Sequence, residues 1–137
     1  MINTFKILSI SLMTAFSTFA FQQDKSKMLM GEWKVQEVTA EYPATTPAAD
    51  KMRSEMDFDK FANRFKSSPF IFGKDSVLSV MGMDAHWTLE KDNLHIRIIL
   101  MQNEELMATI ISLDSHQLKF SVIDHDTKEL FTLIKIK

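Results

Sequence analysis

The chain has 137 residues, of which 45% are hydrophobic and 25% charged, with a formal net charge of −2. This length suffices for one ordinary globular domain and is too short for two. The near-neutral charge excludes the strongly basic surface typical of nucleic-acid binding. No cysteine is present, which excludes disulfides, thiolate metal sites and a cysteine nucleophile.

Residues 1–20 have the pattern of a cleaved secretory signal peptide. Lys6 precedes an apolar stretch, and residues 18–20 read Thr-Phe-Ala, with small side chains at the two positions that a signal peptidase recognises. The stretch is short for a membrane span and interrupted by Ser and Thr. We therefore predict a mature domain of residues 21–137, secreted or periplasmic, without a membrane span. An uncleaved N-terminal helix or anchor is the alternative.

The mature chain begins with one strand and one helix. Residues 31–41 alternate apolar and polar side chains, which predicts a strand. Thr46 is the expected N-cap of a helix with Pro47 at its first position, and Ser67-Ser68-Pro69 ends it. The apolar residues of this helix recur at helical spacing; they are Met52, Met56, Phe58, Phe61, Ala62 and Phe65.

The remainder of the chain reads as strands separated by short, turn-rich breaks. The expected strands are 70–73, 76–81, 85–90, 94–101, 106–113, 117–124 and 129–136. Short breaks connect antiparallel neighbours, because a parallel crossover needs about a dozen residues or more. With the strand at 31–41, the sequence predicts an all-β fold with one helix, an eight-stranded antiparallel up-and-down barrel, which on closing removes both edges. A half-open sheet with the helix packed on it also fits the pattern.

A register across these strands separates an inner from an outer face, since opposed residues share a face. Pairing Trp87 with Ile98 and continuing across the following strands gives an apolar interior, which we take as the candidate ligand-binding set. It comprises Trp87, Ile96, Ile98, Thr109, Ile111, Phe120, Val122 and Thr132. The same register predicts an apolar cluster on the outer face, made of Ile99, Ala108, Ile110, Ile123, Phe131 and Leu133.

Gly31-Glu32-Trp33 begins the first strand of this eight-stranded meander. The motif resembles the G-x-W signature of lipocalins and their fatty-acid-binding relatives, the calycins, and roughly residues 28–137 look most like a small, secreted bacterial lipocalin-like domain. The resemblance implies that Trp33 closes one end of the barrel and stacks on a basic side chain from the last strand. Lys135 or Lys137 is in position for this, where the families usually have Arg.

The helix between the first two strands is similar to the helical lid of fatty-acid-binding proteins. Strand direction places it at the end opposite Trp33, beside the loops at 82–84, 103–105 and 124–129. The expected lid residues are Met52, Met56, Phe61 and Phe65, with Phe58 between them. Met81, Met83, Met101 and Met107 lie near the same end and could provide an adaptable apolar mouth. The alternative is that the helix contributes only to the core, or covers the outer cluster.

No catalytic or metal-binding motif accompanies this pattern. His86, His95, His116 and His125 do not share a site in the expected register, so solvated histidines are the better interpretation. We therefore predict a non-catalytic protein, without metal or cofactor, that binds or carries a small hydrophobic molecule. The alternative is a barrel filled by its own side chains that acts as an interaction or structural module, for instance a homodimer, through the outer cluster.

Overall fold

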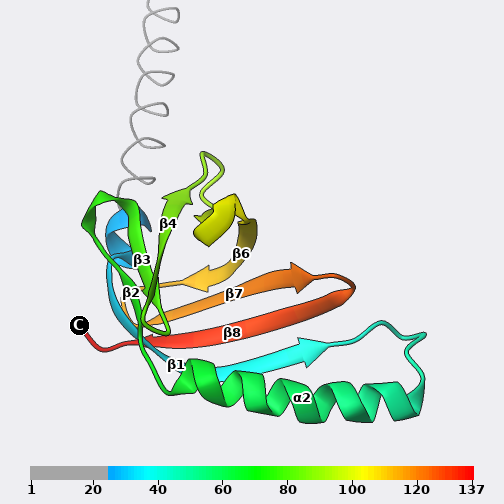
Figure 1. Cartoon of the computed structure of the whole chain (residues 1–137). Helices are drawn as coiled ribbons and strands as arrows, with labels where there is room; N and C mark the ends of the chain where they lie inside the picture. The colour runs from blue at the N-terminus through cyan, green and yellow to red at the C-terminus, as the bar shows by residue number, and fades with distance from the viewer. Residues whose placement is uncertain (1–24) are drawn as a thin grey trace, which may run out of the picture.

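Eight antiparallel strands close into a barrel in sequence order in the computed structural model, which describes residues 25–137 (Figure 1). The elements are β1 (Gly31–Glu41), α2 (Ala48–Lys66), β2 (Phe70–Phe72), β3 (Val77–Val80), β4 (Met83–Leu89), β5 (His95–Ile99), β6 (Glu105–Leu113), β7 (Gln117–Asp124) and β8 (Thr127–Lys135). The predicted fold class is confirmed. The predicted signal peptide and the start of the predicted domain at residue 21 lie outside the described residues.

Tight turns join several of the strands, and their residue types fit their geometry. Met81 and Gly82 connect β3 to β4 with φ values of 52° and 75°, as a two-residue hairpin turn of this hand requires. Asp92 and Asp114 each accept two backbone N–H groups of the following turn residues. These Asx-type contacts stabilise the β4–β5 and β6–β7 turns at one end of the barrel.

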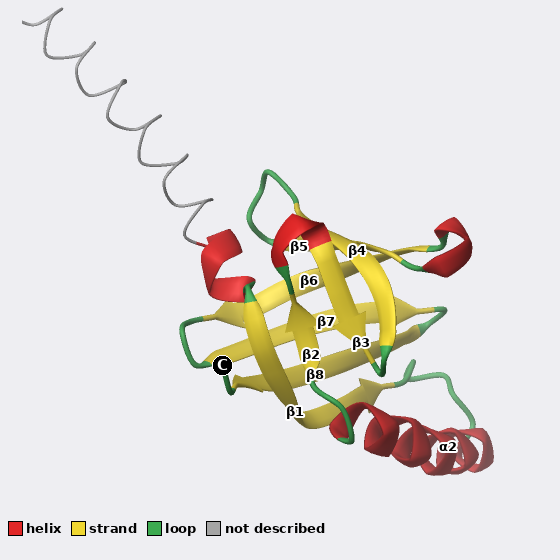
Figure 2. Ribbon diagram, turned by 60° about the vertical axis from the view of Figure 1, so that its left-hand side comes forward, coloured by secondary structure: helices red, strands yellow, loops and turns green. Residues whose placement is uncertain are grey.

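That end of the barrel is filled by side chains. The largest fully buried residues all come from the segments that meet there: Leu29, Trp33, Val35, Leu78, Ile96, Leu118 and Leu133. A helical turn at residues 25–29 lies across it and contributes Leu29 to the core (Figure 2). We call this the closed end, and the opposite end, with the β3–β4, β5–β6 and β7–β8 turns, the mouth.

Helix α2 occupies a position where the sheet alone is incomplete. β2 has three residues and its pairing with β1 is limited to Gly31–Trp33, so the mouth half of β1 pairs with β8 alone. α2 runs back alongside β1 (Figure 1) and buries Ala62 and Phe65. The expected cap is wrong by one residue: Pro47 is itself the N-cap, its carbonyl accepts the N–H of Lys51 at 2.9 Å, and no side chain caps the helix.

The expected register is right across β4–β5 and wrong across the three later pairs, β5–β6, β6–β7 and β7–β8. Trp87 lies opposite Ile98, as predicted. However, Ile98 pairs with Leu106 rather than with Thr109. Phe120 pairs with Ile110 rather than with Ile111 on one side, and with Phe131 rather than with Ile134 on the other. All three shifts are odd in number, so the inner and outer faces of β6 and β8 are exchanged, whereas β7 keeps the predicted inner face.

The exchange corrects both residue sets that the register defined. Thr109 and Ile111 are exposed, and Thr132 alternates with the buried residues of β8. Conversely, four members of the predicted outer cluster are buried inside the barrel: Ala108, Ile110, Phe131 and Leu133. Only Ile99 and Ile123 remain on the outer face, so the predicted outer apolar cluster is wrong.

Candidate ligand-binding site

A cavity of about 500 Å³ lies at the mouth, opposite the filled closed end. Its lining comes from α2, from residues of the seven strands β2–β8 and from the mouth turns: Phe61, Phe65, Phe70, Leu78, Val80, Met81, Met83, Asp84, Ala85, Ile98, Leu100, Met101, Gln102, Glu104, Leu106, Phe120, Val122, Asp124, Glu129 and Phe131. This volume lies in the range of small-molecule sites, which are typically apolar with a few polar groups.

Phenylalanines form one continuous wall of the cavity. Phe120 and Phe131 stack with centroids 4.8 Å apart, and Phe65 meets Phe131 edge-on at 5.3 Å. Phe61 extends the series from α2, 4.6 Å from Phe65. Such offset or edge-to-face pairs are favourable beyond the area they bury. The C-terminal half of α2 is therefore part of the wall, and the position of the helix sets the shape of the cavity.

Methionines border the cavity at the mouth turns. Met81 and Met83 come from the β3–β4 turn and Met101 from the β5–β6 connection. Their unbranched, polarizable side chains adapt to irregular apolar shapes. Met107 is partly exposed and does not line the cavity, because β6 presents its other face to the interior.

The polar groups of the lining are mainly acidic. Asp84, Glu104, Asp124 and Glu129 contribute carboxylates, Gln102 contributes an amide, and no Lys, Arg or His is among the lining residues. Glu129 is the most buried of the four acids, with 9% of its surface exposed. Burial raises the pKa of Glu129, and the nearby charge of Asp124 raises it further.

The structure brings together only part of the predicted site. Ile98, Phe120, Val122, Phe61 and Phe65 line the cavity. Trp87 and Ile96 are buried but lie outside it, and Nε1 of Trp87 donates to the Gly73 carbonyl at 3.3 Å. Thr109, Ile111 and Thr132, which the register also assigned to the ligand-binding set, do not line the cavity. Of the lid residues, Met52 and Met56 are 66% and 64% exposed and do not line the cavity.

Sequence reasoning missed Glu129 and Phe131 as lining residues. Both lie on the face of β8 that the expected register turned outward. The usable signal was the turn: Asp124 pairs with Thr127, which leaves only His125 and Asp126 between the strands. A two-residue turn there fixes Phe131 opposite Phe120.

Trp33 and Lys135 lie together at the closed end. Nζ of Lys135 is 5.1 Å from the Trp33 ring centroid and donates to the Met28 carbonyl at 2.9 Å, a cation–π geometry. Nε1 of Trp33 donates to the Leu29 carbonyl at 2.8 Å. The indole and the ammonium thus both hold the 25–29 turn over the end of the barrel.

Gly31 has a steric reason to precede this tryptophan. Its φ is +130°, and a Cβ there would lie 2.4 Å from the Lys137 carbonyl oxygen and 2.8 Å from Cε of Lys135. An L-residue rarely adopts this backbone conformation, and the space is occupied. The Gly-x-Trp spacing therefore serves closure of the barrel and not ligand binding.

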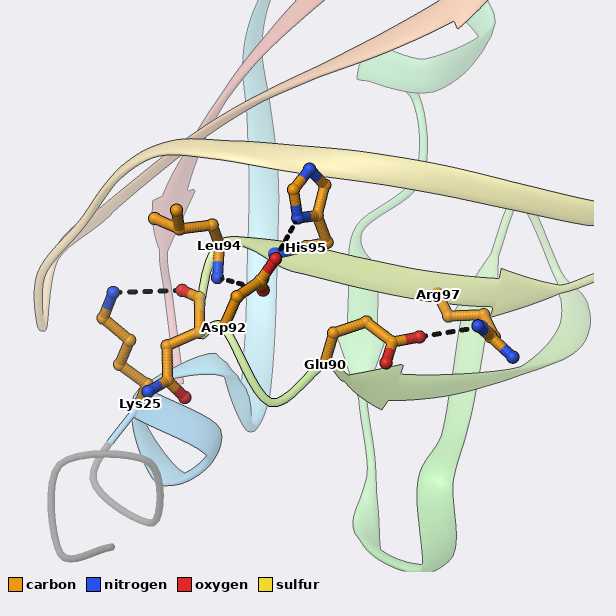
Figure 3. Close-up of polar contacts among 7 residues, drawn as sticks. Lys25, Glu90, Asp92, Leu94, His95 and Arg97 are labelled. Carbon is orange, nitrogen blue, oxygen red and sulfur yellow. Dashed lines mark hydrogen bonds and ion pairs between the residues drawn. The ribbon is translucent and has the colours of Figure 1, made fainter. Parts of the chain in front are cut away.

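Surface polar contacts gather around the β4–β5 turn (Figure 3). Nζ of Lys25 donates to the Asn93 carbonyl at 3.0 Å, and Nδ1 of His95 lies 2.5 Å from Asp92 Oδ2. The hydrogen bond from the Leu94 N–H, followed by the hydrogen bond with the His95 ring, lowers the pKa of Asp92. Nε of Arg97 lies 2.8 Å from Glu90. These contacts stabilise a turn; across residues 25–137 no cluster of three His, Asp or Glu side chains could hold a metal ion.

Comparisons with protein-family models, curated proteins and solved structures found no match. The eight-stranded closed barrel with one helix between β1 and β2 is consistent with a calycin-like fold. Over the described part of the chain, no helix combines the length and apolar character needed to cross a membrane.

Proposed function

We propose that this protein binds or carries a small, largely apolar molecule in the cavity at the barrel mouth. The observation that carries the proposal is the cavity itself: about 500 Å³ walled by Phe120, Phe131, Phe65 and Ile98. An eight-stranded barrel is just wide enough either to be filled by side chains or to hold one small ligand. This barrel is filled at its closed end and hollow at its mouth.

Burial of the ligand's apolar surface supplies the affinity. Each Å² removed from water contributes about 25 cal/mol before the costs of association are subtracted. Phe61 and Phe65 act as the inner face of a lid in this proposal, since both come from α2 and line the cavity. The methionines of the mouth turns would adapt to the shape of the molecule that enters.

The proposed carrier is non-catalytic and works outside the cytoplasm. Support for export is the signal-like pattern of residues 1–20, and support for kinship with small secreted lipocalin-like domains is the Gly31–Trp33 motif placed at the start of a closed barrel. The interaction-module alternative depended on an outer apolar cluster, four residues of which are inside the barrel. We therefore do not propose it.

Native mass spectrometry of the protein purified from its own source tests the proposal. We expect a reproducible mass above that of the polypeptide, which disappears after denaturation and organic extraction and is recovered in the extract. The stripped protein should then take up an apolar fluorescent dye with one-to-one stoichiometry. A bare polypeptide mass together with no dye uptake by the folded protein contradicts the carrier function.

A further inference from the structure

We infer that the ligand carries a positively charged, amine-type head group, and that Glu129 binds this group while the apolar body lies against Phe120 and Phe131. The inference rests on the proposed function and specifies the chemical class of the ligand. It comes from the position of one buried carboxylate in a largely apolar chamber whose other charged lining residues are also acidic.

Glu129 belongs to the inward-facing series of β8. The buried residues of this strand alternate as Glu129, Phe131 and Leu133. Across the β7–β8 pair, Glu129 lies opposite Val122, Phe131 opposite Phe120, and Leu133 opposite Leu118. The carboxylate is therefore one step further toward the mouth than the stacked phenylalanines, and one step inside Asp124, which pairs with Thr127 at the end of the hairpin.

No protein cation neutralises this carboxylate within residues 25–137. The Glu129 side chain is nine-tenths buried and has neither a hydrogen bond nor an ion pair there. The neighbouring Lys128 is exposed and does not line the cavity. A carboxylate that is mostly buried and has no protein partner is unfavourable in its charged form, so a proton or a cationic ligand at Glu129 would stabilise it.

The charged side chains that line the cavity with Glu129 all have the same sign. Asp124 on β7 lies close enough to raise its pKa. Tyr42, at the end of β1, has its own pKa raised by burial and by the negative charges of Glu55, Asp59 and Glu129. Two more acids of the lining, Asp84 and Glu104, come from the mouth turns.

The negative electrostatic potential of these acidic residues favours some ligand head groups over others. A carboxylate, sulfate or phosphate head would meet like charge from several strands, which disfavours its binding. A neutral head would leave Glu129 without a charged partner. A protonated amine supplies both N–H donors and the opposite charge, and charge-assisted hydrogen bonds are the stronger kind. With the amine at Glu129, an attached apolar chain points toward Phe120 and Phe131, as the order of residues along β8 requires.

Three ligands that share one tail separate the contributions of head and tail. Decylamine, decanol and decanoate would be titrated into the delipidated protein at neutral pH by dye displacement and calorimetry. We expect decylamine to bind about tenfold or more tightly than decanol, the increment of one charged hydrogen bond, and decanoate to bind most weakly. Equal or tighter binding of decanoate overturns the amine assignment and leaves the carrier function standing. Failure of all three to bind overturns both.

Substitution then assigns the preference to Glu129. Glu129→Gln should remove the advantage of decylamine over decanol and leave decanol binding within about threefold. Glu41→Gln is the matched control, since Glu41 is an exposed acid near the same end that does not line the cavity; it should retain the preference. Asp124→Asn, at the rim of the cavity, provides a second test of the preference if Glu129→Gln folds poorly. It should lower the affinity for decylamine and leave the affinities for the other two ligands unchanged. The inference is contradicted if Glu41→Gln loses the decylamine preference to the same extent as Glu129→Gln. It is also contradicted if neither Glu129→Gln nor Asp124→Asn loses that preference.

Discussion

Phe120 and Phe131 lie opposite each other on β7 and β8 and stack with their ring planes 9° apart. Phe131 also contacts Phe65 and Phe70, so it is the residue at which the helix, β2 and β7 meet. Replacement of Phe131 by Ala should lower the free energy of unfolding by about 3 kcal/mol or more, because several aromatic contacts are lost at once. Urea denaturation measures this. Phe61→Ala, at a residue that is 37% exposed, should cost clearly less, and equal losses would argue against the described packing.

Ile98 faces the cavity, whereas its neighbour Ile99 faces outward. Ile98→Trp should fill part of the chamber and abolish uptake of an apolar dye, with at most a moderate loss of stability because the indole enters existing space. Ile99→Trp adds the same bulk on the outer face and should leave dye binding unchanged. Fluorescence titration with thermal melting as a folding check compares the two. Retained dye binding in Ile98→Trp would place the ligand elsewhere.

Ile110 is buried and Ile111, at the irregularity in β6, is 54% exposed. Ile110→Asn should destabilise the protein by about 3 kcal/mol or more, since it combines a lost apolar contact with a buried amide. Ile111→Asn should change stability by about 0.5 kcal/mol or less. Chemical denaturation of the two variants directly tests the register of β6, because the opposite register reverses their order.

Gly31 has a positive φ, and the space that a Cβ would need there is occupied. Gly73 has no positive φ and leaves more room for a Cβ. Gly31→Ala should lower the free energy of unfolding by roughly 2 kcal/mol through backbone strain and the contact with the Lys137 carbonyl. Gly73→Ala should be much milder. The Trp33 fluorescence should change in the first variant, since closure over the indole is disturbed, and an unchanged melting temperature in Gly31→Ala would contradict the described closure.

The raised pKa of Glu129, caused by burial and by Asp124, predicts a pH-dependent contribution to stability. The folded state binds the proton of Glu129 more tightly than the unfolded chain does, so this contribution declines as pH rises from the ordinary Glu pKa through the raised one. Without ligand, Glu129→Gln should therefore gain stability relative to the parent above that interval and show no gain below it. Denaturation of parent and variant at a series of pH values measures the difference between their free energies of unfolding. Asp92 and Asp114, whose pKa values are lowered, are present in both proteins, so their opposite pH effects cancel in this difference. A constant difference would contradict the linkage.

The sequence was sufficient for the strands, the helix and their up-and-down order, because turn residues and alternation mark each element locally. It did not distinguish a closed barrel from a half-open sheet, and the structure shows closure. β4 and β5 present one clearly apolar face each, so the pairing of Trp87 with Ile98 could be predicted. The position of the mouth followed from strand direction alone, and Met81, Met83 and Met101 are found there.

The register of β6 and β8 could not be predicted by the same means. Both faces of β6 carry apolar side chains, with Ile110 on one and Ile111 on the other, and β8 offers Phe131 and Ile134 on opposite faces. Alternation does not show which face of such a strand is the inner one, so the register is determined by the length of the connecting turn. Glu129 was the hardest residue to place, because hydrophobic patterning assigns a charged residue to the outer face by default.

The limited length of β2 has a consequence for how the chain folds. Residues 37–41 of β1 have no strand partner except β8. Their backbone therefore makes no hydrogen bonds to another strand until β8, the last strand, has been synthesised and docks. Pairing of β1 with β8 brings together two strands that are far apart in the sequence, so we expect the barrel to close late and slowly in folding. During that interval the exposed edge could pair with another chain. Glu37 and Glu41, whose charges interrupt this segment, act as gatekeepers that discourage such pairing before β8 arrives.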